Sequence, residues 1–183
     1  MKTKTENVIL AGLFAALICM GAFIKVPLLF VPMTLQFFFV NLAILFQERP
    51  YGILSVLAYL LLGLGGLPVF AGGGGISYLL NPTFGYLIGF LLAAAVSGYL
   101  KNRLAHTASG CILLSMLNIF LIHLCGVSYF YCLSNFYLGN PISFTKLLVV
   151  GSLIFLPNDI LSGVLSSFFA VKMRRLRNTR RMA

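Results

Sequence analysis

The chain has 183 residues, of which 60% are hydrophobic and only 9% are charged, and its formal net charge is +10. About a quarter of the residues of a soluble domain are charged, so this composition excludes a soluble globular protein and predicts an integral membrane protein. Six of the thirteen basic residues follow Val171. A basic tail beside an apolar helix sets membrane orientation and contacts anionic lipids, so the net charge does not indicate nucleic-acid binding.

Six apolar runs predict six membrane-spanning helices in a single domain that covers residues 1–183. The runs cover residues 8–26, 33–46, 51–64, 83–100, 111–133 and 147–171. The second and third runs have fourteen residues each, about 21 Å of helix against a hydrocarbon core of about 30 Å, so they form either short spans or a re-entrant hairpin. Pro27 and Pro32 bracket the connector after the first run, which we expect to be extended or kinked.

The basic residues predict how these spans are oriented. If both termini are cytoplasmic, eleven of the thirteen basic residues lie inside and only Lys25 and Lys146 lie outside, which agrees with the positive-inside rule. Residues 1–7 then form a cytoplasmic N-terminus and residues 172–183 a basic cytoplasmic tail. The same orientation places residues 63–89 in an outer loop between the third and fourth spans.

Residues 63–89 contain nine of the eighteen glycines, including four in a row from Gly72 to Gly75. Such a run disfavours a helix, because each glycine adds backbone entropy that folding must remove. The residues around it are nevertheless too apolar for an ordinary solvated loop. An apolar, glycine-rich and irregular segment indicates a backbone packed against a neighbouring helix, a cavity or a ligand.

Asp159 is an acidic residue within an apolar span, and it follows Pro157 and Asn158. A carboxylate near mid-membrane costs about 2.5–3.5 kcal/mol, so it should face a cavity or a partner, either on a substrate path or as a polar lock between helices. His123 is either a packed, hydrogen-bonded core residue or a proton carrier. Lys25 is either an interfacial side chain or a ligand contact.

No enzyme site emerges from the sequence. The glycine run lacks the lysine of a GxxxxGK[ST] phosphate loop, so we expect no ATP hydrolysis by this chain. The four cysteines show no CxxC spacing, and the two histidines form no nucleophile–base pattern. We therefore predict neither a catalytic residue nor a bound metal or cofactor.

Four segments carry a likeness to a known family. They are Gly66-Leu-Pro-Val-Phe-Ala-Gly-Gly-Gly-Gly75, Asn81-Pro-Thr-Phe-Gly-Tyr-Leu-Ile-Gly-Phe90, Pro32-Met-Thr-Leu-Gln36 and Leu156-Pro-Asn-Asp159. Together they closely resemble the signature of the BioY family, the biotin-binding S components of energy-coupling factor (ECF) transporters. The resemblance implies an all-α, six-helix membrane bundle with both termini in the cytoplasm. It also implies a biotin pocket near the outer face, built from the loop after the first span, the glycine-rich segment and the last helix.

The resemblance implies how biotin would be held in that pocket. Asp159 would accept a hydrogen bond from a ureido N–H group, and Asn81 would donate to the ureido carbonyl. Backbone N–H groups of the glycine run, such as those of Gly73 and Gly74, are the other candidate donors. The side chains expected to pack on the apolar ring and tail are Tyr78, Phe84 and Tyr86.

One position departs from the family pattern. The family commonly has a lysine three residues after the aspartate, where this chain has Ser162. Lys25 is therefore the candidate partner for the carboxylate of biotin.

The resemblance further implies partners and a location. A transmembrane T component and two cytoplasmic ATPases would drive uptake across the cytoplasmic (inner) membrane of a bacterium. Ala11 and Ala15 allow close approach of another helix, which belongs either to this chain or to the T component. The alternatives are an S component for another vitamin or precursor, a small membrane acyltransferase, and a purely structural membrane subunit.

Overall fold

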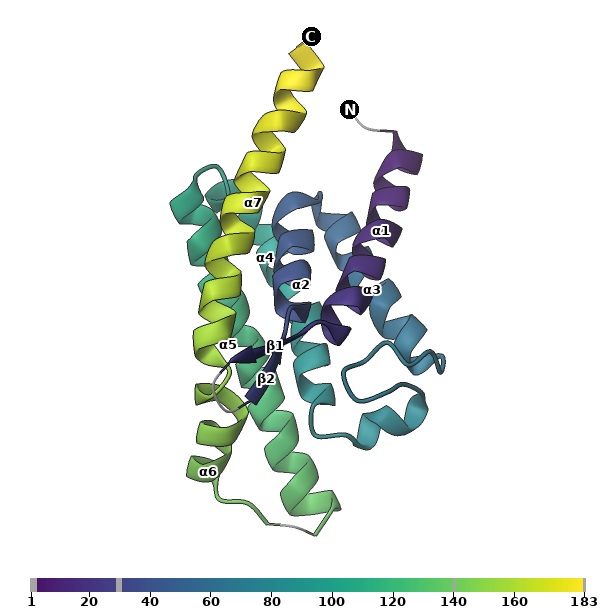
Figure 1. Ribbon diagram of the computed structural model, residues 1–183, viewed down its shortest axis with the longest axis vertical. Coiled ribbons are helices and arrows are strands. Elements are labelled where there is room, and N and C mark those ends of the chain that lie inside the picture. Colours follow the sequence, from purple (N-terminus) through teal and green to yellow (C-terminus); the bar gives the residue numbers. More distant parts are fainter. Residues whose placement is uncertain (1–2, 29–30, 140, 183) are drawn as a thin grey trace.

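The computed structural model describes residues 3–28, 31–139 and 141–182, without the side chains of residues 25–28, 31–33, 178 and 180–182. The described chain is mostly helical (Figure 1). Its elements are α1 (Lys4–Phe23), β1 (Lys25–Leu28), β2 (Val31–Thr34), α2 (Gln36–Phe46), α3 (Arg49–Leu64), η1 (Ile76–Leu80), α4 (Phe84–Leu104), α5 (Ala108–Cys132), η2 (Leu133–Tyr137), α6 (Phe144–Leu148), η3 (Val149–Leu153) and α7 (Leu156–Met182). The element η1 is a 3-10 helix, whereas η2 and η3 are π-helical turns that follow α5 and α6.

Four stretches of the described chain are helical, long and apolar enough to cross a membrane, as expected for a membrane protein. They cover Lys4–Phe23, Phe84–Leu104, Ala108–Tyr137 and Phe144–Arg177. The two short apolar runs of the sequence form two further helices, α2 with 11 residues and α3 with 16.

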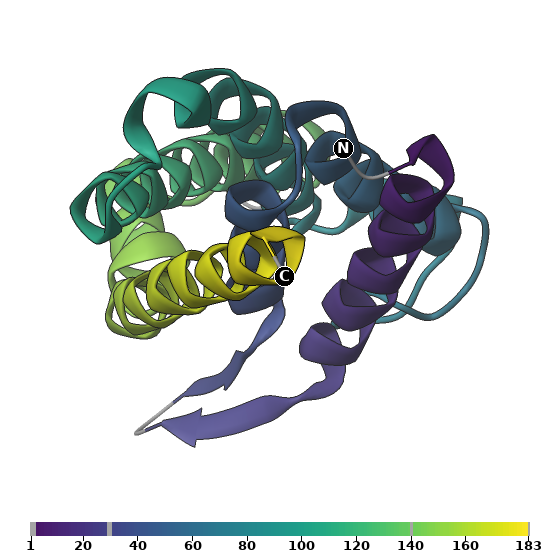
Figure 2. The ribbon, with the colours of Figure 1, turned by 90° about the horizontal axis from the view of Figure 1, so that it is seen from above.

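Helix α2 lies toward the middle of the bundle, with α7 and α1 on either side of it (Figure 2). Nine of its 11 residues are buried. Basic side chains from other helices bind the carbonyl groups at its C-terminal end, where a cation is favourable. Lys101 Nζ donates to the Ile44 carbonyl over 3.2 Å, and the Arg174 guanidinium donates to the carbonyls of Leu45 and Ala105. These contacts join α2, α4 and α7.

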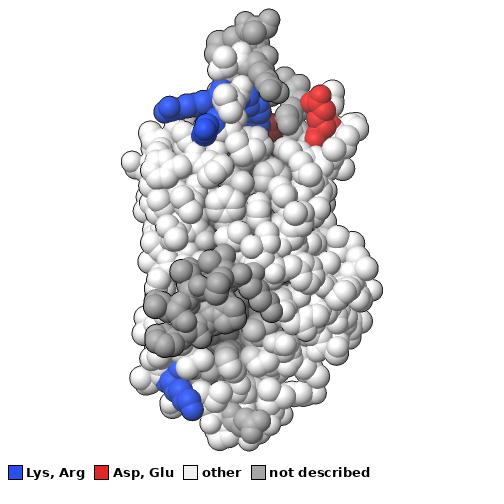
Figure 3. Space-filling model, in the orientation of Figure 1, with Lys and Arg blue, Asp and Glu red and all other residues white. Residues whose placement is uncertain are grey.

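Both termini lie at the same end of the molecule, and charged side chains gather there (Figure 3). The connection from α5 to α6 lies at the opposite end, where the view also shows a basic side chain. The described surface between the two ends is almost free of charge in this view. This distribution suits a bundle whose middle is surrounded by lipid.

The connector after α1 is a small antiparallel hairpin of β1 and β2, in which Lys25 pairs with Thr34 and Pro27 with Pro32. The prolines predict extended backbone, which the structure contains, but they do not predict that the two strands pair. The hairpin is therefore a departure from the all-α prediction. Proline is tolerated because each strand of a two-stranded ribbon has an open edge.

Glycines let α4 pack closely against α5. A Cβ atom at Gly85 would lie 2.3 Å from the Cβ of Tyr129, and one at Gly89 would lie 2.7 Å from the Cα of Ile122. Small residues four positions apart allow such close helix contact in lipid. The contact brings Tyr86 and His123 side by side, with ring centroids 5.8 Å apart.

A buried polar layer joins four helices on the side of the core toward the basic end. Asn41 of α2 donates from Nδ2 to Ser115 of α5 and Ser166 of α7, in both cases over 2.7 Å. Asn118 of α5 donates to Asn41 Oδ1 over 2.7 Å and accepts from Ser97 of α4 over 2.6 Å. The amide groups are thus hydrogen-bonded in the apolar interior, which fixes α2 against α4, α5 and α7.

Candidate functional site

A cavity of about 490 Å³ lies where the N-terminal turns of α2, α4 and α7 converge. Its walls come from the hairpin and α2, the glycine-rich loop, α4, α5, and the segment from η3 into α7. The lining residues are Thr34, Gln36, Phe37, Ala71, Gly72, Tyr78, Asn81, Thr83, Tyr86, Leu87, Phe90, Ile122, His123, Phe130, Val150, Gly151, Phe155, Asn158 and Asp159. The lining is mostly apolar, with a few polar groups, as is usual for a small-molecule site.

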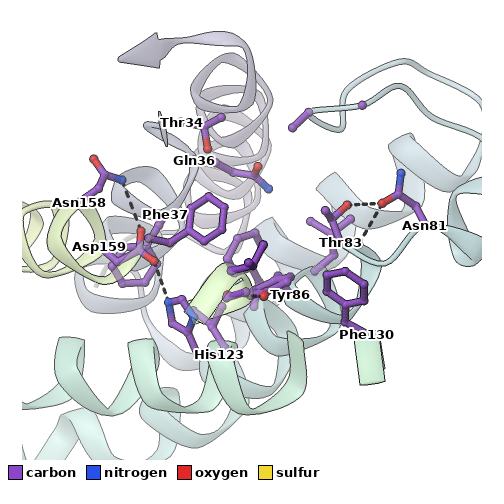
Figure 4. A pocket seen from close by; sticks show the side chains of 18 of the residues that line it. Thr34, Gln36, Phe37, Asn81, Thr83, Tyr86, His123, Phe130, Asn158 and Asp159 are labelled. Atoms are coloured by element: carbon purple, nitrogen blue, oxygen red, sulfur yellow. Dashed lines mark hydrogen bonds and ion pairs between the residues drawn. The ribbon is translucent and has the colours of Figure 1, made fainter. Parts of the chain in front are cut away.

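Polar side chains occupy separate parts of the cavity wall (Figure 4). Asp159, Asn158 and His123 lie together on one side, and Asn81 and Thr83 lie together on another. Aromatic side chains, including Phe37 and Tyr86, lie between them. The cavity therefore presents separate hydrogen-bonding regions with aromatic side chains between them, and Thr34 and Gln36 add polar side chains from the hairpin and α2.

Asp159 lies in the first turn of α7. The last apolar span is broken at this point, because the π-helical η3 ends at Leu153 and α7 starts at Leu156. Proline is tolerated at position 157, because an N–H group in the first turn of a helix has no acceptor within the helix, so none is lost. The break places a helix N-terminus, with its partial positive charge, next to the Asp159 carboxylate.

His123 contacts Asp159 directly. Its Nε2 lies 2.9 Å from Asp159 Oδ2, and its Nδ1 lies 3.0 Å from the hydroxyl of Ser152 on η3. The side chains of His123 and Asp159 are 10% and 17% exposed. The sequence offers a core role or a proton-carrier role for His123, and the pairing with Asp159 is missed because 36 residues separate the two.

The side-chain oxygen of Asn81 accepts two hydrogen bonds within its own turn. Oδ1 accepts from the backbone N–H of Thr83 over 2.9 Å and from the Thr83 hydroxyl over 2.8 Å. The Thr83 hydroxyl also lies 2.9 Å from the Tyr78 hydroxyl. Because Oδ1 is used in this turn, the orientation of the amide is fixed and Nδ2 is left as the donor available to a ligand.

Tyr86 crosses from α4 toward η3, and two glycines make room for it. Its hydroxyl donates to the Gly151 carbonyl. A Cβ atom at Gly126 would lie 2.3–2.5 Å from the Tyr86 ring, and one at Gly151 would lie 2.9 Å from its hydroxyl oxygen. Neither glycine stands out in the sequence, because its partner belongs to a different helix.

The glycine run shapes the loop between α3 and α4 more than it lines the cavity. Gly72 lines the cavity, whereas Gly73 and Gly74 lie outside the lining. Gly73 has a φ of 123° and exchanges two backbone hydrogen bonds with Phe70, and a Cβ atom at Gly74 would lie 2.0 Å from the Leu67 carbonyl oxygen. Only glycine fits either conformation, so these two residues position the loop.

Four other predicted residues lie outside the cavity lining or outside the described side chains. Phe84 is buried outside the cavity lining, with its ring centroid 5.9 Å from that of Tyr129. Lys25 lies in β1, but its side chain is outside the described residues. Ala11 and Ala15 are 1% and 3% exposed, so their side chains are covered by other parts of this chain. That α1 contacts a partner subunit through these two residues stays a prediction.

Gln36 and Thr34 line the cavity although no site role follows for them from the sequence. Gln36 donates from Nε2 to the hydroxyl of Tyr59 over 3.0 Å and is 6% exposed. Both residues belong to the Pro32-Met-Thr-Leu-Gln36 segment, so the motif itself is the signal that could have found them.

Comparison with known proteins identifies the family. A family model described as the BioY family matches residues 1–179. The chain belongs to the BioY family. The probable biotin transporter BioY of Lysinibacillus sphaericus is 39% identical over 174 residues, covering 94% of this chain and 89% of that protein. The biotin transporter BioY of Thermotoga maritima is 37% identical over 179 residues, covering 93% of this chain and 97% of that protein.

A solved structure agrees with this assignment. The crystal structure of the S-component for biotin from an ECF-type ABC transporter matches with a TM-score of 0.79 and 25% sequence identity, covering 96% of this chain and 95% of that chain. The resemblance of the four sequence segments to the BioY family is thus confirmed. Each of these segments contributes to the cavity wall of this BioY-family chain, whereas the departing residue, Ser162, is 3% exposed and lies outside the lining.

Proposed function

We propose that this chain is the substrate-binding subunit of a biotin uptake system and that biotin binds in the cavity. The observation that carries the proposal is that the four segments of the BioY likeness all contribute to one cavity wall. The similarity to proteins named as biotin transporters supports the same substrate. The chain acts without catalysis, and ATP is hydrolysed in partner subunits.

The chemistry of the wall suits the two ends of biotin. Asp159 accepts from a ureido N–H group, and Asn81 Nδ2, in a different hydrogen-bonding region, donates to an oxygen of biotin. Tyr78 and Tyr86 pack on the bicyclic ring and the aliphatic tail. The N-terminal turns of α2, α4 and α7 supply partial positive charge toward the cavity, which favours an anionic ligand such as the biotin carboxylate.

The proposed setting is a single membrane domain with six spans in the cytoplasmic membrane of a bacterium. Both termini lie in the cytoplasm, and the glycine-rich loop and the mouth of the cavity face outward. The gathering of basic side chains at the end that carries both termini supports this orientation. A T component and two ATPases complete the transporter and drive uptake.

Isothermal titration of the purified, detergent-solubilised chain with biotin tests the proposal. We expect saturable binding of one biotin per chain, competition by unlabelled biotin in a radioligand assay, and no competition by riboflavin or thiamine. Binding of another vitamin in place of biotin would assign the chain to a different substrate. Absence of binding for all of them would contradict a substrate-capture role.

A further inference from the structure

His123 is the histidine of the described cavity wall, and the proposed function above does not use it. We infer that His123 is a positioning residue of the biotin site. It donates from Nε2 to Asp159 Oδ2 and so leaves Asp159 Oδ1 turned toward the ureido N–H of the substrate. This inference rests on the proposed function, because it assigns a second residue to the same site.

The hydrogen-bonding partners determine which ring nitrogen carries the proton. An ionised carboxylate only accepts, so the 2.9 Å contact with Asp159 Oδ2 requires a hydrogen on Nε2. A hydroxyl both donates and accepts, so Ser152 satisfies Nδ1 at 3.0 Å in either protonation state of the ring. His123 thus keeps the same contact with Asp159 whether it is neutral or charged.

The surroundings hold the ring in this orientation. Ser152 belongs to η3, Asp159 to α7 and His123 to α5, so the three side chains link the broken last span to α5. The ring of Tyr86 on α4 lies nearly perpendicular to the imidazole, at 87°. With its plane fixed by Tyr86 and its two nitrogens by partners on different elements, His123 fixes the Asp159 carboxylate in turn.

The two oxygens of Asp159 are used unequally. Oδ2 makes the short contact with His123, whereas the contact of Oδ1 with Asn158 Nδ2 is long, at 3.4 Å. Oδ1 is therefore the oxygen with hydrogen-bonding capacity left for a ligand N–H. Ser162, one turn later on α7, is buried and uncharged, so it does not compete with His123 for the carboxylate.

A double-mutant cycle measured by titration with biotin tests this role. We expect His123→Leu to lower the affinity for biotin about tenfold or more, because the Asp159 carboxylate loses a hydrogen bond to a donor. His123→Gln keeps an N–H donor on a side chain of similar reach, so its affinity should stay within about threefold of wild type. In the Asp159→Asn background, His123→Leu should cause little further loss, because the two residues act as one unit.

Three results would overturn the inference: unchanged biotin affinity in His123→Leu, equal losses in His123→Leu and His123→Gln, or losses that multiply in the double variant. His106→Leu is the matched control, because His106 is exposed and contacts the Asn102 carbonyl at the basic end. Its affinity should equal that of wild type.

Nitrogen-15 NMR of the histidine side chains tests the pairing without biotin. The chain has two histidines, so His106→Gln assigns the signals of His123. We expect the Nε2 signal of His123 to be of the protonated type and to shift in Asp159→Asn and in Ser152→Ala. Unchanged His123 signals in both variants would overturn the inference, whereas a protein that binds no biotin but shows these shifts would contradict only the proposed function.

Discussion

Asp159 places a carboxylate in an apolar part of the chain, where insertion of a charge costs about 2.5–3.5 kcal/mol. Two features of its surroundings offset this cost. The first turn of α7 contributes a favourable dipole interaction of about 0.3–1 kcal/mol, and the His123 imidazole donates a hydrogen bond over 2.9 Å. The remaining acceptor capacity of the carboxylate faces the cavity, where a ligand N–H can use it.

Replacing Asp159 by Asn removes the anionic acceptor while keeping the side-chain volume. We expect biotin affinity to fall on the order of ten- to a hundredfold, because a hydrogen bond to a charged group contributes about 1.5–3 kcal/mol. Isothermal titration of the purified variant measures this loss. Glu48→Gln, which changes an exposed acid at the basic end, should bind like wild type. Unchanged affinity in Asp159→Asn would exclude the residue from the site.

Lys25 stays the candidate cation for the biotin carboxylate, with its backbone placed in β1. Lys25→Ala should lower the affinity for biotin on the order of tenfold and should change the affinity for uncharged biotin amide much less. Competition assays with the two ligands compare these losses. Losses of equal size for both ligands would rule out pairing between Lys25 and the carboxylate.

Sequence reasoning located part of the candidate site at this scale. Asp159 stands out because it is an acid in an apolar span, and Asn81 because it begins a segment that resembles the BioY signature; the structure places both in the cavity wall. His123 and Gly126 could not be assigned in this way. Their roles depend on partners on other helices, Asp159 and Tyr86, and a single sequence carries no record of such pairs.

At the scale of elements, the site depends on breaks in otherwise regular helices. The π-helical η3 ahead of α7 exposes the Gly151 carbonyl to Tyr86 and turns Ser152 toward His123. π-Helical turns often occur at functional sites because they reorient nearby groups. Each apolar run of the sequence overlaps a helix of the structure, and Pro157 marks an interruption of the last run. The geometry of the break is not encoded in hydropathy, because it is set by contacts with α4 and α5.

Gly126 tests how closely α4 and α5 must approach. Gly126→Ala places a methyl group within 2.3–2.5 Å of the Tyr86 ring, so the ring must shift and the cavity wall changes shape. Overpacking of this kind costs about 1–3 kcal/mol. We expect a lower melting temperature for the purified chain in detergent and weaker biotin binding.

Gly12→Ala is the matched control for this prediction, because a Cβ atom at Gly12 of α1 has no neighbour within 4 Å. Its melting temperature should equal or exceed that of wild type, since alanine is the better helix former. A Gly126→Ala chain as stable as Gly12→Ala would show that Tyr86 is not held against α5.

At the scale of the whole molecule, the charged side chains of the described residues gather at the ends, and the described surface between the ends shows almost none in this view (Figure 3). The end with both termini also carries the Lys101 and Arg174 contacts to the carbonyls that close α2 and α4. Some of the basic residues at this end bind helix carbonyl groups within the chain. Fewer of them than the sequence contains are therefore free to contact lipid headgroups and to set the orientation. The proposed orientation therefore needs a direct measurement.

Cysteine accessibility provides this measurement, because the two ends of the bundle contain exposed serines. Ser109 lies near the start of α5 at the basic end, and Ser143 precedes α6 at the opposite end. In a background with the four native cysteines replaced by serine, a membrane-impermeant maleimide added to intact spheroplasts should label Ser143→Cys and spare Ser109→Cys. Permeabilised spheroplasts should show labelling of both variants. The reverse pattern would place the termini outside and would turn the mouth of the cavity toward the cytoplasm, where it could not capture external biotin.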